Sequence, residues 1–322
     1  MLRTPLCDLL GIDVPIIGAP FGPWEQVGLA AAICEAGALG SLGTAVRSPP
    51  ELEAQWARLR ALTDRPFAVN HTARPLDEAA FTATLAARPR AISFHLAVPA
   101  DLVSRAHDAG ILWIQQVVSA RQAEEALAAG ADVLVAQGGE AGGNSGFVAT
   151  LVLVPQVVDL AGDVPVVAAG GIADGRGVAA ALALGAQGAS LGTRFLASTE
   201  MAIADAWKRR IVEADALDAV KVEHSERVMP PFSRPAPPVA PRALHTPLVD
   251  RLRERPDEVE PAELGPRLVA AVRVGRGEDL LPFTGQSAGL VREILPAGEI
   301  VRRLVAEAEA ALGAAARAVV SP

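Results

Sequence analysis

The chain of 322 residues has no excess of basic side chains and no long apolar segment. Its 29 Lys and Arg residues are outnumbered by 37 Asp and Glu residues, and the formal net charge of -8 argues against nucleic-acid binding through a basic face. No segment reaches about eighteen uninterrupted apolar residues, so we expect no membrane span. Asp and Pro interrupt the N-terminus before an apolar run is long enough for a secretory signal.

Cysteine and histidine are also scarce. The two cysteines, Cys7 and Cys34, show neither a CxxC pattern nor the spacing of metal ligands, so we expect ordinary thiols in a reducing cytoplasm. The five histidines are scattered along the chain and give a zinc site little support. The sequence therefore favours a cytoplasmic protein without a metal centre.

Apolar residues are plentiful by contrast. They make up 51% of the chain, against 20% charged residues, which excludes a disordered polyelectrolyte and supplies a large core. The length suits one large domain, or one domain with an attached cap. The apolar surplus is also compatible with a homodimer.

Short apolar runs alternate with longer amphipathic stretches. Each run is continuously apolar, as in strands that are covered on both faces, and several amphipathic stretches end in a glycine typical of helix C-termini. The eight predicted strands cover residues 15–20, 38–44, 66–70, 91–97, 111–118, 131–138, 165–171 and 188–195. Eight parallel strands with crossovers predict an α/β fold of the (β/α)8 TIM-barrel type. A doubly wound sheet is the alternative.

The rest of the chain differs in composition. Residues 228–247 contain many prolines and cannot form a regular helix, so we expect an extended connector that wraps the body. An Ala-rich amphipathic stretch near the C-terminus predicts helix. We therefore expect a barrel as the main part of residues 1–227, a connector over 228–247 and a helical part over 248–322.

Three predicted strand ends are unusual, and in such barrels the loops at the carboxyl ends of the strands form the active site. The sixth strand runs into "QGGEAGGNSG", the seventh into "AAGGIADGRG" and the eighth into "LGTRF". Gly170, Gly171, Gly192 and Thr193 offer backbone N–H groups and a hydroxyl to a phosphate group. Asp174 is placed to cap the next helix. The alternative is that these glycines only make tight turns.

The segments "PIIGAPFG", "PFAVN", "ISFHL", "AQGGEAGGNSG", "AAGGIADGRG" and "TGQSAGL" resemble, in order and spacing, the nitronate monooxygenases, formerly called 2-nitropropane dioxygenases. The resemblance covers nearly the whole chain and implies an FMN-dependent TIM barrel that oxidises alkyl nitronates with O2, with the C-terminal part returning to the flavin. It further implies flavin contacts from the backbone of Ala19, Pro20 and Phe21, from Asn70, Gln116, Gln137, Gly142 and Gly143, from the phosphate site named above, and from Gln286.

The resemblance also places a histidine where this chain has Asn144. In the family that histidine removes the α-proton of a neutral nitroalkane, which an amide cannot do near neutral pH. Three interpretations remain open. Asn144 orients a nitronate that is already deprotonated; His95 or His71, both at predicted strand ends, supplies the base; or the substrate differs, as in an NAD(P)H-dependent reductase of quinones or enoyl thioesters. Taken alone, both histidines also fit packed, hydrogen-bonded core residues.

Other features bear on these interpretations. Tyrosine is absent, which removes the phenol proton donor of many flavin reductases. The spacing of "GGIADGRG" suits a single phosphate rather than a pyrophosphate, so no dinucleotide fingerprint is present. Glu140 fits a capping or solvated role as well as that of a buried acid. A flavin-binding protein without turnover is a further class of function; otherwise we expect a small-molecule substrate and O2 as partners.

Overall fold

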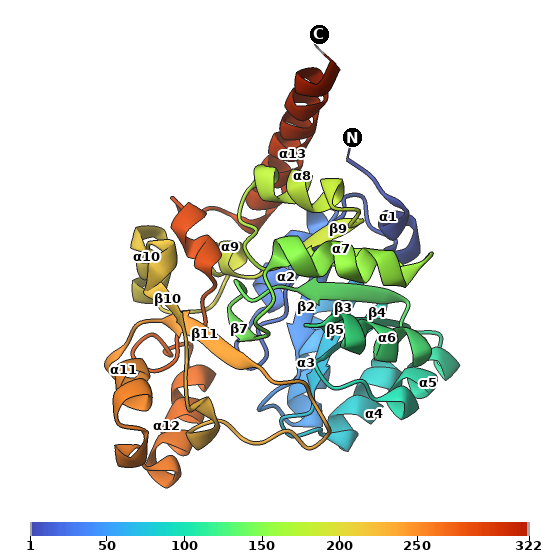
Figure 1. Ribbon diagram of the computed structural model, residues 1–322. Helices are drawn as coiled ribbons and strands as arrows, with labels where there is room; N and C mark the ends of the chain where they lie inside the picture. Colours follow the sequence, from blue (N-terminus) through green and yellow to red (C-terminus); the bar gives the residue numbers. More distant parts are fainter. Residues whose placement is uncertain (1, 321–322) are drawn as a thin grey trace.

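A ring of eight parallel strands forms the centre of the computed structural model, which describes residues 2–320 (Figure 1). The strands pair in the order β1-β9-β8-β6-β5-β4-β3-β2, and a parallel bridge between Ile17 and Leu39 joins the two ends of the sheet. The ring strands are β1 (Ile16–Gly18), β2 (Gly40–Gly43), β3 (Phe67–Thr72), β4 (Ala91–His95), β5 (Leu112–Val117), β6 (Val133–Gln137), β8 (Val166–Ala169) and β9 (Gly188–Leu191). The predicted TIM barrel is confirmed.

All eight predicted strands are present. The first seven end within two residues of the predicted positions, whereas the last ends four residues earlier than predicted. β9 stops at Leu191, and the one-turn helix α9 (Thr193–Leu196) follows directly. The prediction of strand over 192–195 is wrong because Gly192 (φ -104°, ψ -73°) leaves the extended conformation. Its carbonyl accepts hydrogen bonds from the backbone N–H groups of Phe195 and Leu196, as the first residue of a helical turn does.

Helices alternate with the ring strands and surround the barrel. Side chains at several helix starts accept backbone N–H bonds from the first turn, and the predicted capping role of Asp174 is confirmed. Besides α9, the helices are α1 (Pro5–Leu10), α2 (Val27–Glu35), α3 (Pro49–Arg60), α4 (Glu78–Ala87), α5 (Ala100–Asp108), α6 (Ala120–Ala128), α7 (Thr150–Ala161), α8 (Gly175–Ala183), α10 (Asp205–Glu213), α11 (Pro247–Glu254), α12 (Pro261–Arg273) and α13 (Ala297–Val320). The 3-10 turns are η1 (Ala216–Asp218), η2 (Ser225–Arg227), η3 (Pro256–Glu258) and η4 (Gln286–Leu290).

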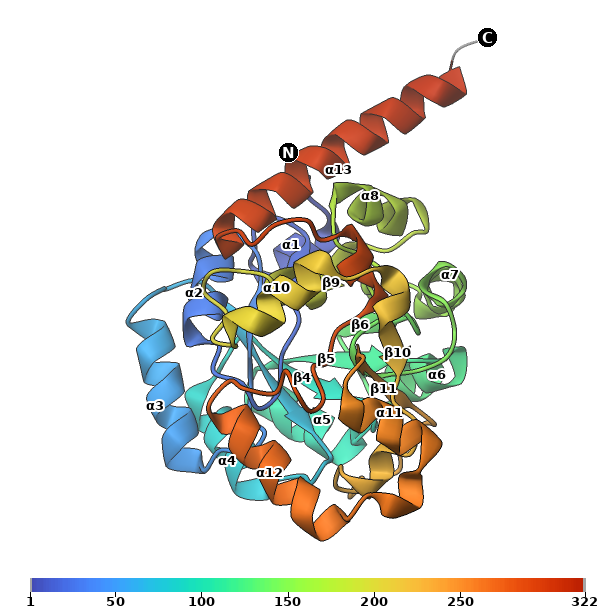
Figure 2. The same cartoon turned by 90° about the vertical axis from the view of Figure 1, so that its left-hand side faces the viewer.

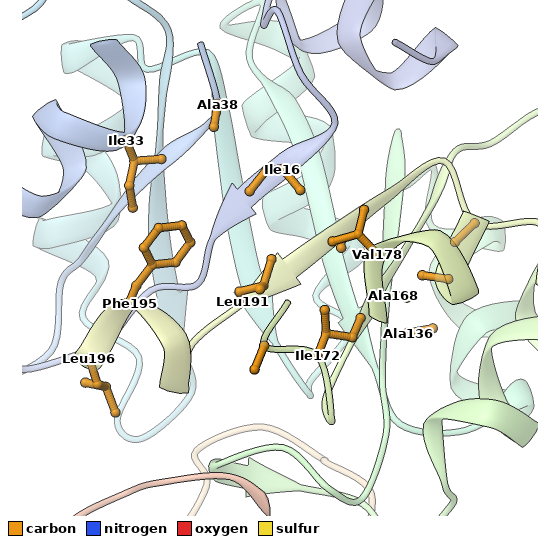
Figure 3. Packing of buried hydrophobic residues seen from close by; sticks show 14 of the residues in the cluster. Ile16, Ile33, Ala38, Ala136, Ala168, Ile172, Val178, Leu191, Phe195 and Leu196 are labelled. Atoms are coloured by element: carbon orange, nitrogen blue, oxygen red, sulfur yellow. The ribbon is translucent and has the colours of Figure 1, made fainter. Parts of the chain in front are cut away.

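The main core lies between the strands and the helices. Alternate strand residues point to opposite faces, so one set of each strand meets the helix layer. Figure 3 shows Ile16 and Leu191 from neighbouring strands, with Ile33 of α2 and Phe195 of α9 packed beside them. Burial of this continuous apolar layer holds the helices on the barrel.

The inside of the barrel changes from apolar to polar along its axis. At the N-terminal end, α1 closes the barrel, and its Leu6 and Leu10 share a buried cluster with inward-facing Ala91 and Val133. Toward the C-terminal ends of the strands the inward positions become polar: Asn70, Ser93, Gln116, Gln137 and Ser190. This polarity places the candidate site at the end where such barrels carry their active sites.

A smaller lobe lies beside the C-terminal end of the barrel (Figure 1). Its antiparallel sheet has the order β10-β11-β7, from β7 (Gly143–Ser145), β10 (Ala219–Lys221) and β11 (Ala240–Leu244). A separate apolar core joins Val222 and Val228 to residues of α11 and α12. The predicted connector 228–247 thus contains a strand, and α11 begins at its last residue, Pro247.

After the lobe the chain returns to the barrel. η4 contacts α9 and α10, and α13 then packs between α8 and α2, in the place of the eighth barrel helix. The C-terminal part of α13 projects beyond the body (Figure 2). Within residues 2–320, no helix combines the length and apolar character needed to cross a membrane.

Candidate active site

Polar side chains surround the barrel axis where the strands end. Asn70, a predicted flavin ligand, donates from Nδ2 to the carbonyl (3.2 Å) and hydroxyl (3.0 Å) oxygens of Ser93 on the next strand. A small cavity of about 20 Å³ lies in this region and includes Pro20, Ser41, Ser93, Gln116 and Ser190 in its lining. Asn70 is therefore anchored by the protein and keeps its amide oxygen for other partners.

Three predicted site residues have buried polar atoms that lack a partner within the described chain. These atoms are Nε2 of Gln116, Oε1 of Gln137 and Oδ1 of Asn144. Gln116 and Gln137 belong to neighbouring strands, and Asn144 follows in the glycine-rich segment. A buried amide atom without a hydrogen bond is costly, so the three atoms indicate a ligand that donates and accepts hydrogen bonds.

His95, a predicted catalytic residue, ends β4 and lies opposite Gln116 of β5. Burial is the main cause that lowers the pKa of His95 from 6.5 to about 4. The positive charge of Arg74 also lowers this pKa, whereas the side chain of Gln116 and the backbone of Asn144 raise it. His95 is therefore a neutral imidazole near pH 7. Through the Gln116 side chain and the Asn144 backbone it connects the ends of β4 and β5 with the glycine-rich segment.

His71 faces away from this site. Since Asn70 points into the barrel, the next residue of the strand points toward the helices. His71 is 2% exposed; its ring nitrogens lie 3.3 Å from the Thr44 hydroxyl and 2.9 Å from that of Thr84 in α4, and its ring meets the edge of Phe81. The hypothesis that His71 is a base facing the flavin is wrong, because it is a packed histidine between strand and helix.

Asn144 is held by a strand from far along the chain. It occupies the middle of β7, opposite Pro241 of β11. The ammonium of Lys221, in β10, donates to the carbonyls of Ser145 (2.9 Å), Gly146 (2.8 Å) and Ala240 (3.1 Å) and lies 2.7 Å from the Ser145 hydroxyl oxygen. The small sheet therefore fixes the backbone of Asn144 at the mouth of the barrel.

Two cations that sequence reasoning missed reinforce this sheet. Burial, helped by the charge of Arg242, lowers the pKa of Lys221 to about 8. Arg242 donates from Nε (3.2 Å) and Nη2 (2.9 Å) to the carbonyl of Gly139. The alternating segment "AVKVE" around Lys221 is a strand signal that could have located it, whereas Arg242 stands among prolines and gives no such signal.

The glycines of the segment after β6 serve mainly to admit protein backbone. A Cβ atom on Gly142 would lie 2.7 Å from the backbone nitrogen of Gly285 and 2.8 Å from the carbonyl carbon of Thr284. Next to this contact, the backbone N–H of Gln286 donates to the carbonyl of Glu140 (2.9 Å). The structure thus brings Gln286, from the C-terminal part, to the glycine-rich segment beside the mouth of the barrel.

Glu140 and Gly143 have separate local roles. The carboxylate of Glu140 accepts hydrogen bonds from the backbone N–H (3.0 Å) and the hydroxyl (2.8 Å) of Thr150, the first residue of α7. It is therefore engaged at a helix start. Gly143 has a φ of 64° and open space where a Cβ would be, so it provides the left-handed turn that leads into Asn144.

The predicted phosphate-binding residues meet at the ends of β8 and β9. Gly170 (φ 98°) and Gly171 (φ 73°) are both left-handed. A Cβ on Gly192 would lie 3.7 Å from the side chains of Ala19 and Phe21, so the segment after β1 reaches the same place. Within the described chain, the backbone N–H groups of Gly171 and Gly192 donate to no protein group. Free amides of this kind suit an anion.

Neighbouring groups are already satisfied. The Thr193 hydroxyl oxygen accepts the backbone N–H of Gly285 (2.8 Å) and retains its proton for another acceptor. At the start of α8, Asp174 accepts two N–H bonds, and Glu307 of α13 accepts the N–H of Gly175 (2.9 Å). The helix start is thus occupied by carboxylates, which leaves the loop glycines as the free donors.

Arg74 is a further residue that sequence reasoning missed. It follows β3, is half-buried, and its guanidinium carbon lies 3.7 Å from the ring centroid of Phe232. Nη1 donates to the carbonyl of Pro230 (2.6 Å), and the buried Nε has no partner among the described residues. Since Phe232 and Pro230 belong to the connector, this segment covers the β3 side of the site.

Comparison with known proteins agrees with this arrangement. The family profile of nitronate monooxygenase matches residues 3–82 and 80–307. A nitronate monooxygenase of Pseudomonas aeruginosa is 33% identical, over 93% of this chain and 97% of that protein.

Two further proteins are similar. A Mycobacterium tuberculosis protein named (3aS,4S,5R,7aS)-5-hydroxy-7a-methyl-1-oxo-octahydro-1H-indene-4-carboxyl-CoA dehydrogenase is 41% identical, over 78% of this chain and 68% of that protein. The structure of FabK from Thermotoga maritima superposes with a TM-score of 0.87 at 34% identity, over 97% of this chain and 98% of the other. Similarity of this extent covers both the barrel and the smaller lobe.

Proposed function

Because the chain belongs to the nitronate monooxygenase family and is an oxidoreductase, we propose that it is FMN-dependent and oxidises a small, already deprotonated substrate, typified by an alkyl nitronate, with O2. The observation that carries this proposal is the chemistry of the mouth. The neutral imidazole of His95 neighbours Gln116 and Asn144 and lies within the influence of a cation, Arg74. The carboxylate of Glu140 is engaged with α7.

The residues present fit a flavin mononucleotide. The ring would be held by Asn70, Gln116 and Gln137, whose amides offer both donors and acceptors, and by the backbone of residues 19–21. Its phosphate would be held by Gly171, Gly192 and Thr193, whose free donors converge at the ends of β8 and β9. Gln286, whose backbone N–H donates to Glu140, would approach the flavin from the side of the glycine-rich segment. When bound, the flavin supplies the redox chemistry, and the protein supplies orientation and electrostatics.

A nitronate suits this site because it needs no protein base. Its α-proton is already gone, so the amide of Asn144 has only to orient the anion through hydrogen bonds. His95, neutral and opposite Gln116, offers a further donor or acceptor at the same place. A neutral nitroalkane would require proton removal, and a base with a pKa of about 4 is poorly matched to that task near pH 7.

A thioester substrate is the second candidate, and it is favoured by the 41% identity to a carboxyl-CoA dehydrogenase. Oxidation of a saturated acyl thioester removes an α-proton and a hydride. His95 would then have to take the proton, with its pKa raised in the complex by the developing negative charge of the substrate, against the lowering effect of burial. An NAD(P)H-dependent reductase of quinones or enoyl thioesters and a flavin protein without turnover remain outcomes of the test.

The test follows the flavin absorbance of the purified holoenzyme without oxygen. Propyl-2-nitronate, 2-nitropropane, a saturated acyl-CoA, NADH and NADPH are added in separate cuvettes. The proposal expects bleaching by the nitronate and reoxidation on admission of O2, with little bleaching by 2-nitropropane. Bleaching by the acyl-CoA alone supports the thioester candidate, bleaching by NADH or NADPH alone a reductase, and no response to any of them a protein without turnover.

A further inference from the structure

We propose that Arg74 binds the negative charge of the substrate and sets the specificity of the site for a planar anion with two oxygens, such as a nitronate or a carboxylate. This inference rests on the proposed function, since it names the charge partner at the same site. It starts from the surroundings of the Arg74 side chain, which the connector arranges.

Arg74 is a half-buried cation without a carboxylate partner among the described residues. Its two identified contacts are a carbonyl, that of Pro230 at 2.6 Å, and an aromatic face, that of Phe232 at 3.7 Å from the ring centroid. Neither contact neutralises the charge. By contrast, Arg234 of the same connector forms two hydrogen bonds (2.8 and 3.0 Å) with the carboxylate of Asp101.

The contacts also leave one edge of the guanidinium, formed by Nε and Nη2, without a hydrogen-bond acceptor among the described residues. Nη1 is used by Pro230, whereas the buried Nε has no hydrogen-bond partner within residues 2–320. Stacking on Phe232 fixes the plane of the group, so Nε and Nη2 present two parallel N–H donors in a fixed orientation. Such an edge matches two oxygens on one central atom, as in a nitronate or carboxylate, and a buried unpaired donor is costly until such a group arrives.

The location of Arg74 connects this edge to the candidate site. Arg74 follows β3, and His95 ends the neighbouring strand β4. Its charge acts on His95 and disfavours the protonated imidazole. Two adjacent cations would repel each other, so the arrangement keeps a single positive charge at this side of the mouth. An anion bound to Arg74 would lie next to His95 and the amides of Gln116 and Asn144, which neighbour His95.

The connector holds Arg74 in place through the loop after β3. Ser233 donates from its backbone N–H (2.7 Å) and its hydroxyl (2.9 Å) to the carbonyl of Ala73, and its hydroxyl oxygen accepts the N–H of Leu76 (3.0 Å). These bonds fix the backbone on both sides of Arg74. Anion recognition is thus a property of the loop after β3 and the connector together.

The experiment titrates oxidised holoenzyme with benzoate and with its neutral counterpart benzamide, followed by flavin absorbance and by calorimetry. The variants are Arg74→Gln, Arg74→Lys and the control Arg234→Gln, which loosens the connector without removing the charge beside His95. We expect Arg74→Gln to weaken benzoate binding roughly 10- to 100-fold, the loss expected for hydrogen bonds to a charged group. Arg74→Lys should restore part of the affinity, and benzamide binding should change little.

Three results would overturn the inference: an Arg74→Gln protein that binds benzoate as wild type does, an equal loss of benzoate and benzamide binding, or an equal loss in Arg234→Gln. Flavin content is measured for each variant, and Arg74→Lys serves if Arg74→Gln does not fold. With propyl-2-nitronate as substrate, Arg74→Gln should raise KM more than it lowers kcat. If wild type does not oxidise the nitronate but benzoate binding depends on Arg74, the proposed function fails and the anion site stands.

Discussion

The ammonium of Lys221 lies 2.7 Å from the hydroxyl oxygen of Ser145, the residue that follows Asn144. Through this contact and the three carbonyls that share the ammonium, the smaller lobe sets the position of a residue in the mouth of the barrel. The candidate site is therefore built by residues from two parts of the molecule, the barrel and the smaller lobe, each with its own apolar core.

Lys221→Met should lower the stability of the fold and raise KM for the substrate. The substitution leaves buried carbonyls without a donor, which costs roughly 1–3 kcal/mol, and it releases β7 from β10. The measurements are thermal unfolding and KM for propyl-2-nitronate. Lys208→Met is the matched control, because Lys208 donates to the carbonyl of Thr199 outside the site. An unchanged KM in Lys221→Met would show that the hydrogen bonds of the Lys221 ammonium do not position Asn144.

Asn144→His should extend activity to neutral nitroalkanes. The imidazole would stand where the family resemblance places a base, and general-base catalysis contributes roughly 100-fold or more. The measurement is anaerobic flavin reduction by 2-nitropropane, with Asn144→Leu as a variant that carries no base. Failure of a well-folded, flavin-loaded Asn144→His protein to react would mean that the base position of the family does not coincide with Asn144.

The pH dependence of nitronate oxidation should be flat between about pH 5.5 and 7, below the pKa of Lys221, which is lowered to about 8. His95 has a pKa lowered to about 4, so it stays neutral throughout this range and changes no charge in the site. The measurement is kcat/KM against pH for wild type and for His95→Gln. A limb near pH 6.5 that disappears in His95→Gln would show that the imidazole titrates normally and takes part as a base.

Gly142→Ala should disturb the contact between the glycine-rich segment and η4. The added Cβ would meet the backbone of Thr284 and Gly285, which cannot move as a flexible side chain does, at a cost of roughly 1–3 kcal/mol. Gly265→Ala in α12 is the control: it has open space, and alanine there should stabilise by roughly 0.5–1 kcal/mol. Thermal unfolding and flavin content distinguish the two; equal stability would contradict the packing described.

The protein should lose stability as the pH falls from 6.5 to about 4. His71 is buried and its folded pKa is lowered to about 4, so in this window the unfolded state binds more protons and gains stability relative to the folded state. Each such histidine contributes at most about 1.4 kcal/mol per pH unit. His71→Gln should reduce the slope of melting temperature against pH; an unchanged slope would mean that His71 titrates alike in both states.

The barrel could be predicted from the sequence because each of its strands is covered on both faces. Such strands appear as short continuous apolar runs, as at 131–138 and 165–171, and local sequence then suffices to find them. The end of β9 could not be placed, because Gly192 breaks the strand within an apolar run. The inward orientation of Asn70 was recognisable through the resemblance. The predicted strand ended at residue 70, whereas β3 continues to Thr72, so the alternation that turns His71 outward was not applied to it.

The smaller sheet was not predictable in the same way. β7 has three residues and β11 contains Pro241, so neither resembles a regular strand. β10 lies in an alternating segment, but the pairing of the three strands joins positions far apart in the chain, which local sequence does not show. The role proposed for Arg74 could not be predicted from the sequence either, because it depends on the absence of a carboxylate partner for its guanidinium among the described residues. Only the folded chain places Arg74 on Phe232, away from any carboxylate of the described residues.

The position of α13 has a consequence for synthesis on the ribosome. Ile300, Val301 and Leu304 are almost fully buried where α13 covers the gap between α8 and α2. Until these residues emerge, the outer layer of the barrel is incomplete and its apolar seam is open to water. The outer layer is therefore complete only after residue 304 has emerged, and a chain stopped before residue 297 would expose an apolar surface prone to aggregation.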